Sequence, residues 1–555
     1  MSALDTVLPE SIIGVLMPLP VLVPLLTAAI TLVLGRRPRA QRAVTIIALT
    51  AVLLVSCALL YLADRDGTHS LAVGGWDAST GNVGPLGIAL VSDRLSALML
   101  VISAVVLLAV MVYSVGQGVR DGDENQPVSI FQPTYLVMTA GICNAFLAGD
   151  LFNLFVGFEV LLTSSFVLLT LGASADRVRA GISYVMVSMV SSLVFLAGIA
   201  FAYAATGTLN LAEMATRLDG IPGGTRTAIF AVLMVAFGIK AAVFPLSTWL
   251  PDSYPTAPAP VTAVFAGLLT KVGVYAMIRA HTLLFPGGSL DDVLMVCGLL
   301  TMLVGILGAI AQADIKRLFS FTLVSHIGYM VFGIALSTHY GLMGAIYYVA
   351  HHIIVQATLF LVVGLIERQA GSSSLRRLGG LAAASPLLAI LFLVPALNLG
   401  GIPPFSGFIG KIALLQAGVD HPSVLSWTLV AGGVITSLLT LYVVARIWTK
   451  AFWRPRADAP EGDLADERPA VLLDDSSDIA FADRDDVGRM PAAMLLPTVA
   501  LVAVGLALTV FAGPMIGYTG RTATDLMDRS IYIDAVLGSH AAPVQEAAGT
   551  SGGAR

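Results

Sequence analysis

Long apolar runs follow one another along almost the whole of this 555-residue chain. A helix needs about 20 apolar residues to cross the hydrocarbon core of a bilayer, and about 14 runs approach that length. They lie near residues 11–35, 41–63, 93–117, 131–149, 151–172, 180–206, 227–250, 260–282, 290–312, 317–337, 341–366, 384–418, 424–453 and 491–516. Only 12% of the residues are charged, about half the share in soluble proteins. The chain is therefore predicted to be an all-α polytopic membrane protein.

The distribution of Lys and Arg between the loops predicts the orientation. If the N-terminus lies outside, the loops after odd-numbered helices are cytoplasmic, and these loops carry most of the basic residues. Both termini are therefore expected outside. Residues 454–490 are acidic and contain Pro, Gly and Ser, a composition typical of a solvated loop, here cytoplasmic.

Two apolar runs are each interrupted by prolines. One is FGIKAAVFPLSTWLPDSYPTAP, residues 237–258, and the other is LNLGGIPPFSGFIGKIALL, residues 397–415. Paired interrupted helices are typical of transporters that contain inverted repeats, with the ion path at the breaks. We therefore predict two inverted five-helix repeats and two broken helices. The predicted divisions are helices 1–3 in 1–130, the repeats in 131–282 (helices 4–8) and 290–453 (helices 9–13), the acidic loop in 454–490, the last helix in 491–516 and a flexible tail in 517–555.

Ionisable side chains occur inside several of these runs. Glu159 lies in FNLFVGFEVLLTSSFVLLTLG, and Lys240 and Lys271 lie near the middle of their own runs. Each charge at a helix centre costs about 2.5–3.5 kcal/mol, and such groups face a bundle interior or a wet cavity. Pairing lowers this cost, so Glu159 and Lys240 are expected to form an ion pair. The alternative, that these charges only bridge helices, stays open because one buried pair is weak evidence of function.

Three histidines add groups that titrate near neutral pH. His326 lies in FSFTLVSHIGYMVFG, and His351 and His352 lie in YYVAHHIIVQATLFLVVG. Each is either a proton carrier or a hydrogen-bonded core residue. Adjacent residues on a helix point about 100° apart, so only one ring of the tandem pair is expected to face a path. No Cys–His or carboxylate–His spacing predicts a metal site, and Cys57, Cys143 and Cys297 are expected to be small core residues.

The motifs around these residues resemble a known family. FNLFVGFEVLLTSSFVLLTLG, GIKAAVFPLSTWLPDSYPTAPAPVTAVFAGLLTKVGVY and GIPPFSGFIGKI are similar to the antiporter-like subunits shared by respiratory complex I and the Mrp cation/proton antiporters. The similarity runs from about residue 90 to 450, and it is greater to the Mrp members.

The resemblance implies a role for each residue. Glu159 would be the fifth-helix carboxylate, Lys240 its seventh-helix partner and Lys271 the eighth-helix relay. Lys411 would be the twelfth-helix lysine at the outer end of a proton path, and His326 would link the two halves. Many relatives carry a lysine in the eleventh helix where this chain has Gln356, which leaves the histidines or water to connect Lys271 with Lys411.

The expected function is therefore proton translocation in a multisubunit Na⁺(cation)/H⁺ antiporter of a bacterial cell membrane. The implied partners are other membrane subunits, protons and monovalent cations, and the lipid bilayer, with no nucleic acid. One alternative is a proton-pumping subunit of an NADH–quinone oxidoreductase or membrane hydrogenase, and another is a non-conducting structural subunit. No cofactor is expected and the chain is not expected to be an enzyme, because it has no dinucleotide glycine fingerprint and no cluster-binding cysteines.

Overall fold

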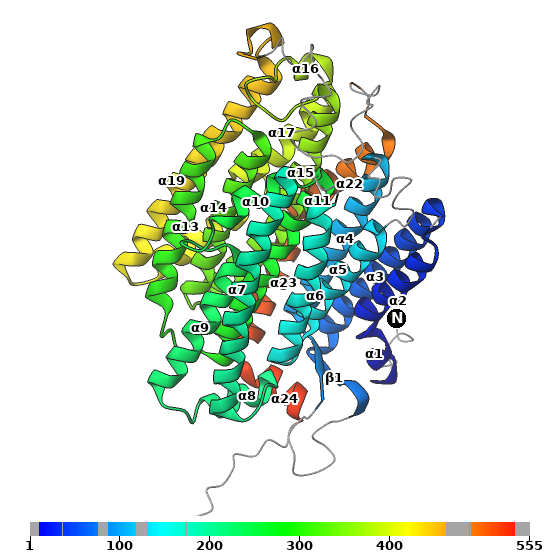
Figure 1. Ribbon diagram of the computed structural model, residues 1–555. Helices are drawn as coiled ribbons and strands as arrows, with labels where there is room; N and C mark the ends of the chain where they lie inside the picture. Colours follow the sequence, from blue (N-terminus) through cyan, green and yellow to red (C-terminus); the bar gives the residue numbers. More distant parts are fainter. Residues whose placement is uncertain are drawn as a thin grey trace, which may run out of the picture.

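A computed structural model describes residues 10–35, 37–75, 87–117, 130–171, 175–461, 488 and 490–538, and almost all of them are helical. The helices pack side by side as one bundle (Figure 1). In the first half they are α1 (Glu10–Leu16), α2 (Leu19–Val33), α3 (Pro38–Asp66), α4 (Arg94–Gln117), α5 (Phe131–Leu147), α6 (Leu151–Thr170), α7 (Ala175–Thr206), α8 (Leu211–Leu218), α9 (Gly223–Ala241), α10 (Trp249–Ser253), α11 (Ala259–Val264) and α12 (Thr270–Arg279). In the second half they are α13 (Asp291–Ala311), α14 (Ile315–Ala335), α15 (His339–Ala370), α16 (Leu381–Ala384), α17 (Pro386–Gly400), α18 (Ser406–Asp420), α19 (Val424–Ile447), α22 (Ala492–Val510), α23 (Ala512–Met527) and α24 (Arg529–Leu537).

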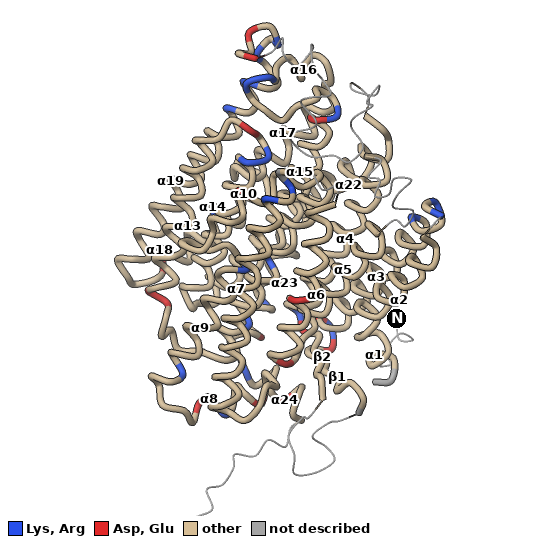
Figure 2. The backbone as a smooth tube through the Cα atoms, in the orientation of Figure 1, with Lys and Arg blue, Asp and Glu red and all other residues tan. Residues whose placement is uncertain are grey.

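Membrane-spanning length and composition are confirmed for most of the predicted runs. Twelve helices of the described chain are long and apolar enough to cross a bilayer. The other two predicted runs correspond to the shorter α5 and to the pair α17–α18. Charged residues gather toward the two ends of the bundle, and few lie along its middle (Figure 2). The distribution suits a bilayer, because the hydrocarbon core excludes unpaired charge.

Both proline-containing runs are broken helices. Helix α9 ends at Ala241, Ala242 adopts a left-handed conformation with φ 60°, and α10 begins only at Trp249. Helix α17 ends at Gly400, and α18 begins at Ser406 beyond the Pro403–Pro404 pair. Proline has no N–H and cannot continue the helical hydrogen bonding, which explains why each helix stops before its prolines.

The segment that carries Lys271 is helical but irregular. Between α11 and α12, residues Phe265–Leu269 form a π-helical turn, and a second π turn, Ala280–Leu284, follows α12. Gly273 lets α12 approach the end of α9 closely, since a Cβ at this position would lie 2.7 Å from the Ala241 nitrogen. The end of the first broken helix is thereby held against the turn of α12 that follows Lys271.

A small hairpin and the C-terminal helices close one end of the bundle. Strands β1 (His69–Ala72) and β2 (Ala89–Ser92) pair antiparallel, with His69 opposite Ser92. The structure differs from the expected flexible tail, because helix continues to Leu537. Helix α23 packs along α15, and α24 packs against α8 and β1. The polar side chains of α23 and α24 interrupt any long apolar run, and this is why the sequence did not reveal these helices.

Two smaller expectations also meet the structure. Cys143 is buried as expected, whereas Cys57 is exposed on the outside of α3 and is not a core residue. Most of the predicted acidic loop lies outside the described residues. At its beginning, the Glu461 carboxylate pairs with Arg376 at 2.9 Å and with Arg377 at 3.1 Å.

Candidate functional site

An ion pair between α6 and α9 is the first element of the candidate site. Lys240 Nζ lies 3.7 Å from Glu159 Oε1, as the cost of isolated charges predicted. Ser192 on α7 joins them: its hydroxyl donates to Glu159 Oε1 and accepts a 3.3 Å hydrogen bond from Lys240 Nζ. No sequence pattern indicated a role for Ser192, because a serine within an apolar helix most often bonds only to its own backbone.

The two partners differ sharply in burial. The Lys240 side chain is 4% exposed, and its ammonium lies 4.9 Å from the centre of the Phe158 ring. The Glu159 side chain is 36% exposed, on a face of α6 that also exposes Phe152 and Val156. Glu159 is thus a carboxylate on the outer surface of a membrane bundle, while its partner lies inside.

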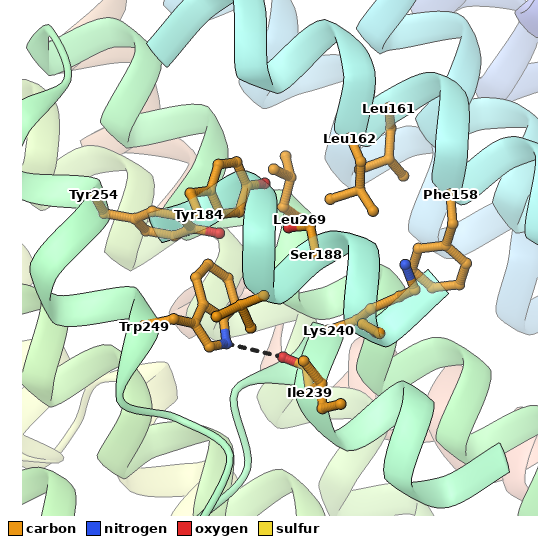
Figure 3. A pocket seen from close by; sticks show the side chains of 12 residues that line it. Phe158, Leu161, Leu162, Tyr184, Ser188, Ile239, Lys240, Trp249, Tyr254 and Leu269 are labelled. Carbon is orange, nitrogen blue, oxygen red and sulfur yellow. Dashed lines mark hydrogen bonds between the residues drawn. The ribbon is translucent and has the colours of Figure 1, made fainter. Parts of the chain in front are cut away.

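A pocket of about 330 Å³ adjoins Lys240 (Figure 3). Its walls combine apolar side chains with the polar groups of Tyr184, Ser188, Ser191 and Tyr254. The hydroxyl of Tyr254 is buried and has no protein partner within the described chain. A liquid water occupies about 30 Å³, so a pocket of this size and polarity can hold several water molecules.

Lys271 lies deeper in the bundle, on α12. Its side chain is fully buried and Nζ donates to the carbonyl oxygen of Ala266 at 2.6 Å. Ala266 belongs to the π turn, and π turns often occur at functional sites. Among the described residues, no carboxylate lies within salt-bridge distance of Lys271.

The three predicted histidines come together between α14, α15 and α18. The Nδ1 atom of His326 lies 2.7 Å from the hydroxyl of Tyr348, and the His326 and His352 rings are 5.3 Å apart. His351 instead turns toward α18, where its Nδ1 lies 3.0 Å from Ser406 Oγ. The tandem histidines therefore face different neighbours, as their 100° separation requires.

Several polar atoms in this cluster lack protein partners in the part of the chain that the structure describes. Both ring nitrogens of His352, the Nε2 atom of His351 and the Oε1 atom of Gln356 are buried there without a hydrogen bond. The amide of Gln356 donates to the Phe319 carbonyl oxygen at 2.9 Å. Lys271 and Lys411 both lie close enough for their charges to act on the His326 and His352 rings. The cluster thus lies between the two lysines.

Lys411 is held by backbone oxygens. Its Nζ donates to the carbonyls of Leu399 at 3.0 Å and Gly400 at 3.1 Å, and it lies 5.3 Å from the centre of the Tyr329 ring. The side chain is buried, and no carboxylate in the described chain pairs with it. Of the three predicted lysines, only Lys240 has an acidic partner among these residues.

A second buried ion pair, which the sequence did not predict, lies under the C-terminal helices. Arg279 Nη1 contacts Asp93 Oδ2 at 2.7 Å, with side-chain exposures of 5% and 7%. The guanidinium lies 5.4 Å from the centre of the Tyr275 ring and 5.0 Å from that of Tyr532. Burial raises the pKa of Tyr532, so its phenol remains protonated beside Arg279.

Known proteins share this bundle of broken helices with buried lysines. Residues 148–440 match the family model of the NADH:quinone oxidoreductase/Mrp antiporter transmembrane region, and the chain belongs to this family. Over 94% of its length the chain is 37% identical to the D-type subunit of the Na⁺/H⁺ antiporter of Alkalihalophilus pseudofirmus, 98% of which is covered.

Solved structures give the same grouping. A chain of the Mrp complex from Dietzia sp. matches with a TM-score of 0.83 at 33% identity, covering 94% of this chain and 100% of that chain. A chain of respiratory complex I from Thermus thermophilus matches with a TM-score of 0.75 at 24% identity, covering 92% of this chain and 99% of that one. The second likeness shows the fold alone.

Proposed function

We propose that this chain is the D-type subunit of a multisubunit Na⁺/H⁺ antiporter and that it moves protons along Glu159, Lys240, Lys271, the histidine cluster and Lys411. The observation that carries the proposal is the line of buried ionisable groups with unpartnered polar atoms between them in the described chain. Buried polar atoms are satisfied by protein or by ordered water. Water beside His352 and Gln356 would join Lys271 to Lys411, although this chain has no lysine at position 356.

The ion pair at one end supports coupling to a neighbouring subunit. A carboxylate facing hydrocarbon is costly, and the Glu159 side chain is 36% exposed on the surface of the bundle. Another membrane subunit of the complex covers this face in our proposal. A change of charge in that subunit would strengthen or weaken the hold of Glu159 on Lys240, and thereby the hold of Lys240 on its proton.

The relative to which the chain is similar over nearly its whole length is named for Na⁺/H⁺ exchange. The redox-linked alternative shares the fold but has less support, since the complex I chain is 24% identical. We place both termini outside, following the distribution of Lys and Arg between the loops. The inverted repeats also remain part of the proposal, and the two broken helices support them.

An assay on everted membrane vesicles tests the proposed function. Vesicles that contain the complete complex are first acidified by respiration, and Na⁺ is then added. Antiport predicts that Na⁺ partly dissipates the pH gradient, and vesicles from cells without the complex provide the control. A complex that shows no cation response but pumps protons during quinone reduction would instead establish the redox-linked alternative.

Ser192 is expected to position the ion pair. Replacing Ser192 by alanine removes a hydrogen bond to each charged partner, and such bonds contribute about 1.5–3 kcal/mol. We expect antiport to fall about 3- to 10-fold and its pH optimum to move, because Lys240 would hold its proton differently. Initial rates of Na⁺-induced pH change across a pH series measure both effects.

Ser164→Ala is the matched control, because the Ser164 hydroxyl on α6 bonds to the Val160 carbonyl oxygen of its own helix. Ser192→Thr keeps the hydroxyl and should restore much of the activity. A Ser192→Ala complex with the wild-type rate and pH profile would show that the bridging hydroxyl has no part in transport.

A further inference from the structure

The break between α17 and α18 leaves two backbone oxygens without their usual donors. In an unbroken helix the carbonyls of Leu399 and Gly400 would accept from the residues four positions on. Those residues are Pro403 and Pro404, which have no N–H. The turn at Gly401 bonds instead to Leu397 and Asn398, and the ammonium of Lys411 contacts both freed oxygens.

These oxygens form a cradle for a small cation. They lie at the C-terminal end of α17, where the helix dipole places partial negative charge. The face of the Tyr329 ring, 5.3 Å from Nζ, adds a further attraction for positive charge. Gly401, with φ 81°, keeps the approach open, because a Cβ there would lie 2.9 Å from Lys411 Cδ.

We propose that the carbonyls of Leu399 and Gly400 form a monovalent-cation site, which the Lys411 ammonium occupies when it is protonated and Na⁺ occupies when the amine is neutral. Carbonyl oxygens at half-helix ends are known ligands for Na⁺ in transporters. The exchange conserves charge, because one proton leaves Lys411 as one Na⁺ binds. Water completes the coordination. The inference rests on the proposed exchange function and adds that this subunit itself binds the cation.

The surroundings of Lys411 favour exchange at this position. No carboxylate of the described chain holds the ammonium in place, so carbonyls and an aromatic ring alone compete with Na⁺. Helices α17 and α22 carry no ionisable side chains. The ionisable residues of the other helices packed on α18 that bear on this site are His326 and Tyr329 on α14, Tyr347, Tyr348 and His351 on α15, and Tyr442 and Arg446 on α19. The nearest of these groups carry no negative charge at neutral pH that would fix Lys411 permanently.

Binding of radioactive Na⁺ to the purified complex, measured at equilibrium, tests the proposal. Lys411→Met removes the internal cation but leaves both carbonyls, so this complex should bind one more Na⁺ than the wild type at neutral pH. Lys411→Arg keeps a permanent charge and should lack that site at every pH, whereas the wild type should gain it under alkaline conditions. Lys271→Met is the matched control, because its amine contacts a single carbonyl and no gain is expected there.

Equal Na⁺ stoichiometry in the Lys411→Met and wild-type complexes would overturn the proposal, as would an equal gain in Lys271→Met. If Lys411→Met does not assemble, the comparison of wild type with Lys411→Arg under alkaline conditions decides, and equal binding would reject the site. The measurement needs no transport. Failure of antiport in vesicles and failure of this binding site are therefore distinguishable.

Discussion

Antiport is expected to fall by at least about 10-fold when Lys240 is replaced by arginine, although the positive charge beside Glu159 is kept. A positioned proton-transfer group contributes about 10²–10⁴-fold in rate, and a guanidinium does not release its proton in proteins. The arginine variant therefore separates ion pairing from proton transfer. Lys240→Ala and Glu159→Ala should abolish antiport as well. Na⁺-induced pH change in everted vesicles measures each variant.

Assembly should survive these changes. Removal of Lys240 leaves Glu159 unpaired, but the glutamate side chain is 36% exposed toward the neighbouring subunit and is not trapped in a dry interior. Subunit content after purification checks this point, and exposed Lys450 supplies the control Lys450→Arg. A Lys240→Arg complex that exchanges Na⁺ for H⁺ at the wild-type rate would assign the lysine a purely structural role.

Stability should fall by about 3–5 kcal/mol when Arg279 is replaced by alanine, because a buried carboxylate is then left without its partner. Asp93 and Arg279 are only 7% and 5% exposed, so neither can turn to water. The loss also removes the guanidinium that contacts Tyr532 of α24. We expect a lower thermal unfolding temperature of the purified complex and less protein in the membrane.

A double variant separates the pair from the residues around it. Asp93→Leu with Arg279→Met removes both charges, and replacing a buried pair by apolar residues is often neutral. It should therefore recover most of the stability lost in Arg279→Ala. Arg65→Ala is the control, since its pair with Asp66 is exposed and such pairs contribute at most about 1 kcal/mol. Equal losses in Arg65→Ala and Arg279→Ala would show that the buried pair has no special weight.

The features that the sequence predicted well are those with a large physical cost. Charges inside apolar runs need partners, and this requirement alone identified the pair of Glu159 and Lys240, which the structure places 3.7 Å apart. Prolines cannot continue a helix, so both breaks were predictable from their positions. The family is confirmed by its matched region and by the relatives. The transport roles of the individual residues remain predictions.

The features that the sequence did not reveal depend on tertiary contacts. The bridging position of Ser192 follows from how α7 faces α6 and α9, and no local pattern distinguishes it from Ser191 beside it. The carbonyl contacts of Lys271 and Lys411 involve backbone atoms, which have no letter in the sequence. Helices α23 and α24 were missed because polar residues interrupt their apolar face. Asp93 and Arg279 stand at run ends, where charges are common.

The most direct test of the proton path is a cryo-EM map of the assembled complex that resolves ordered water. The account predicts a continuous series of water molecules and polar side chains from the pocket beside Lys240, past Lys271 and His352, to Lys411. Dry packing that separates the three lysines into isolated sites would contradict it.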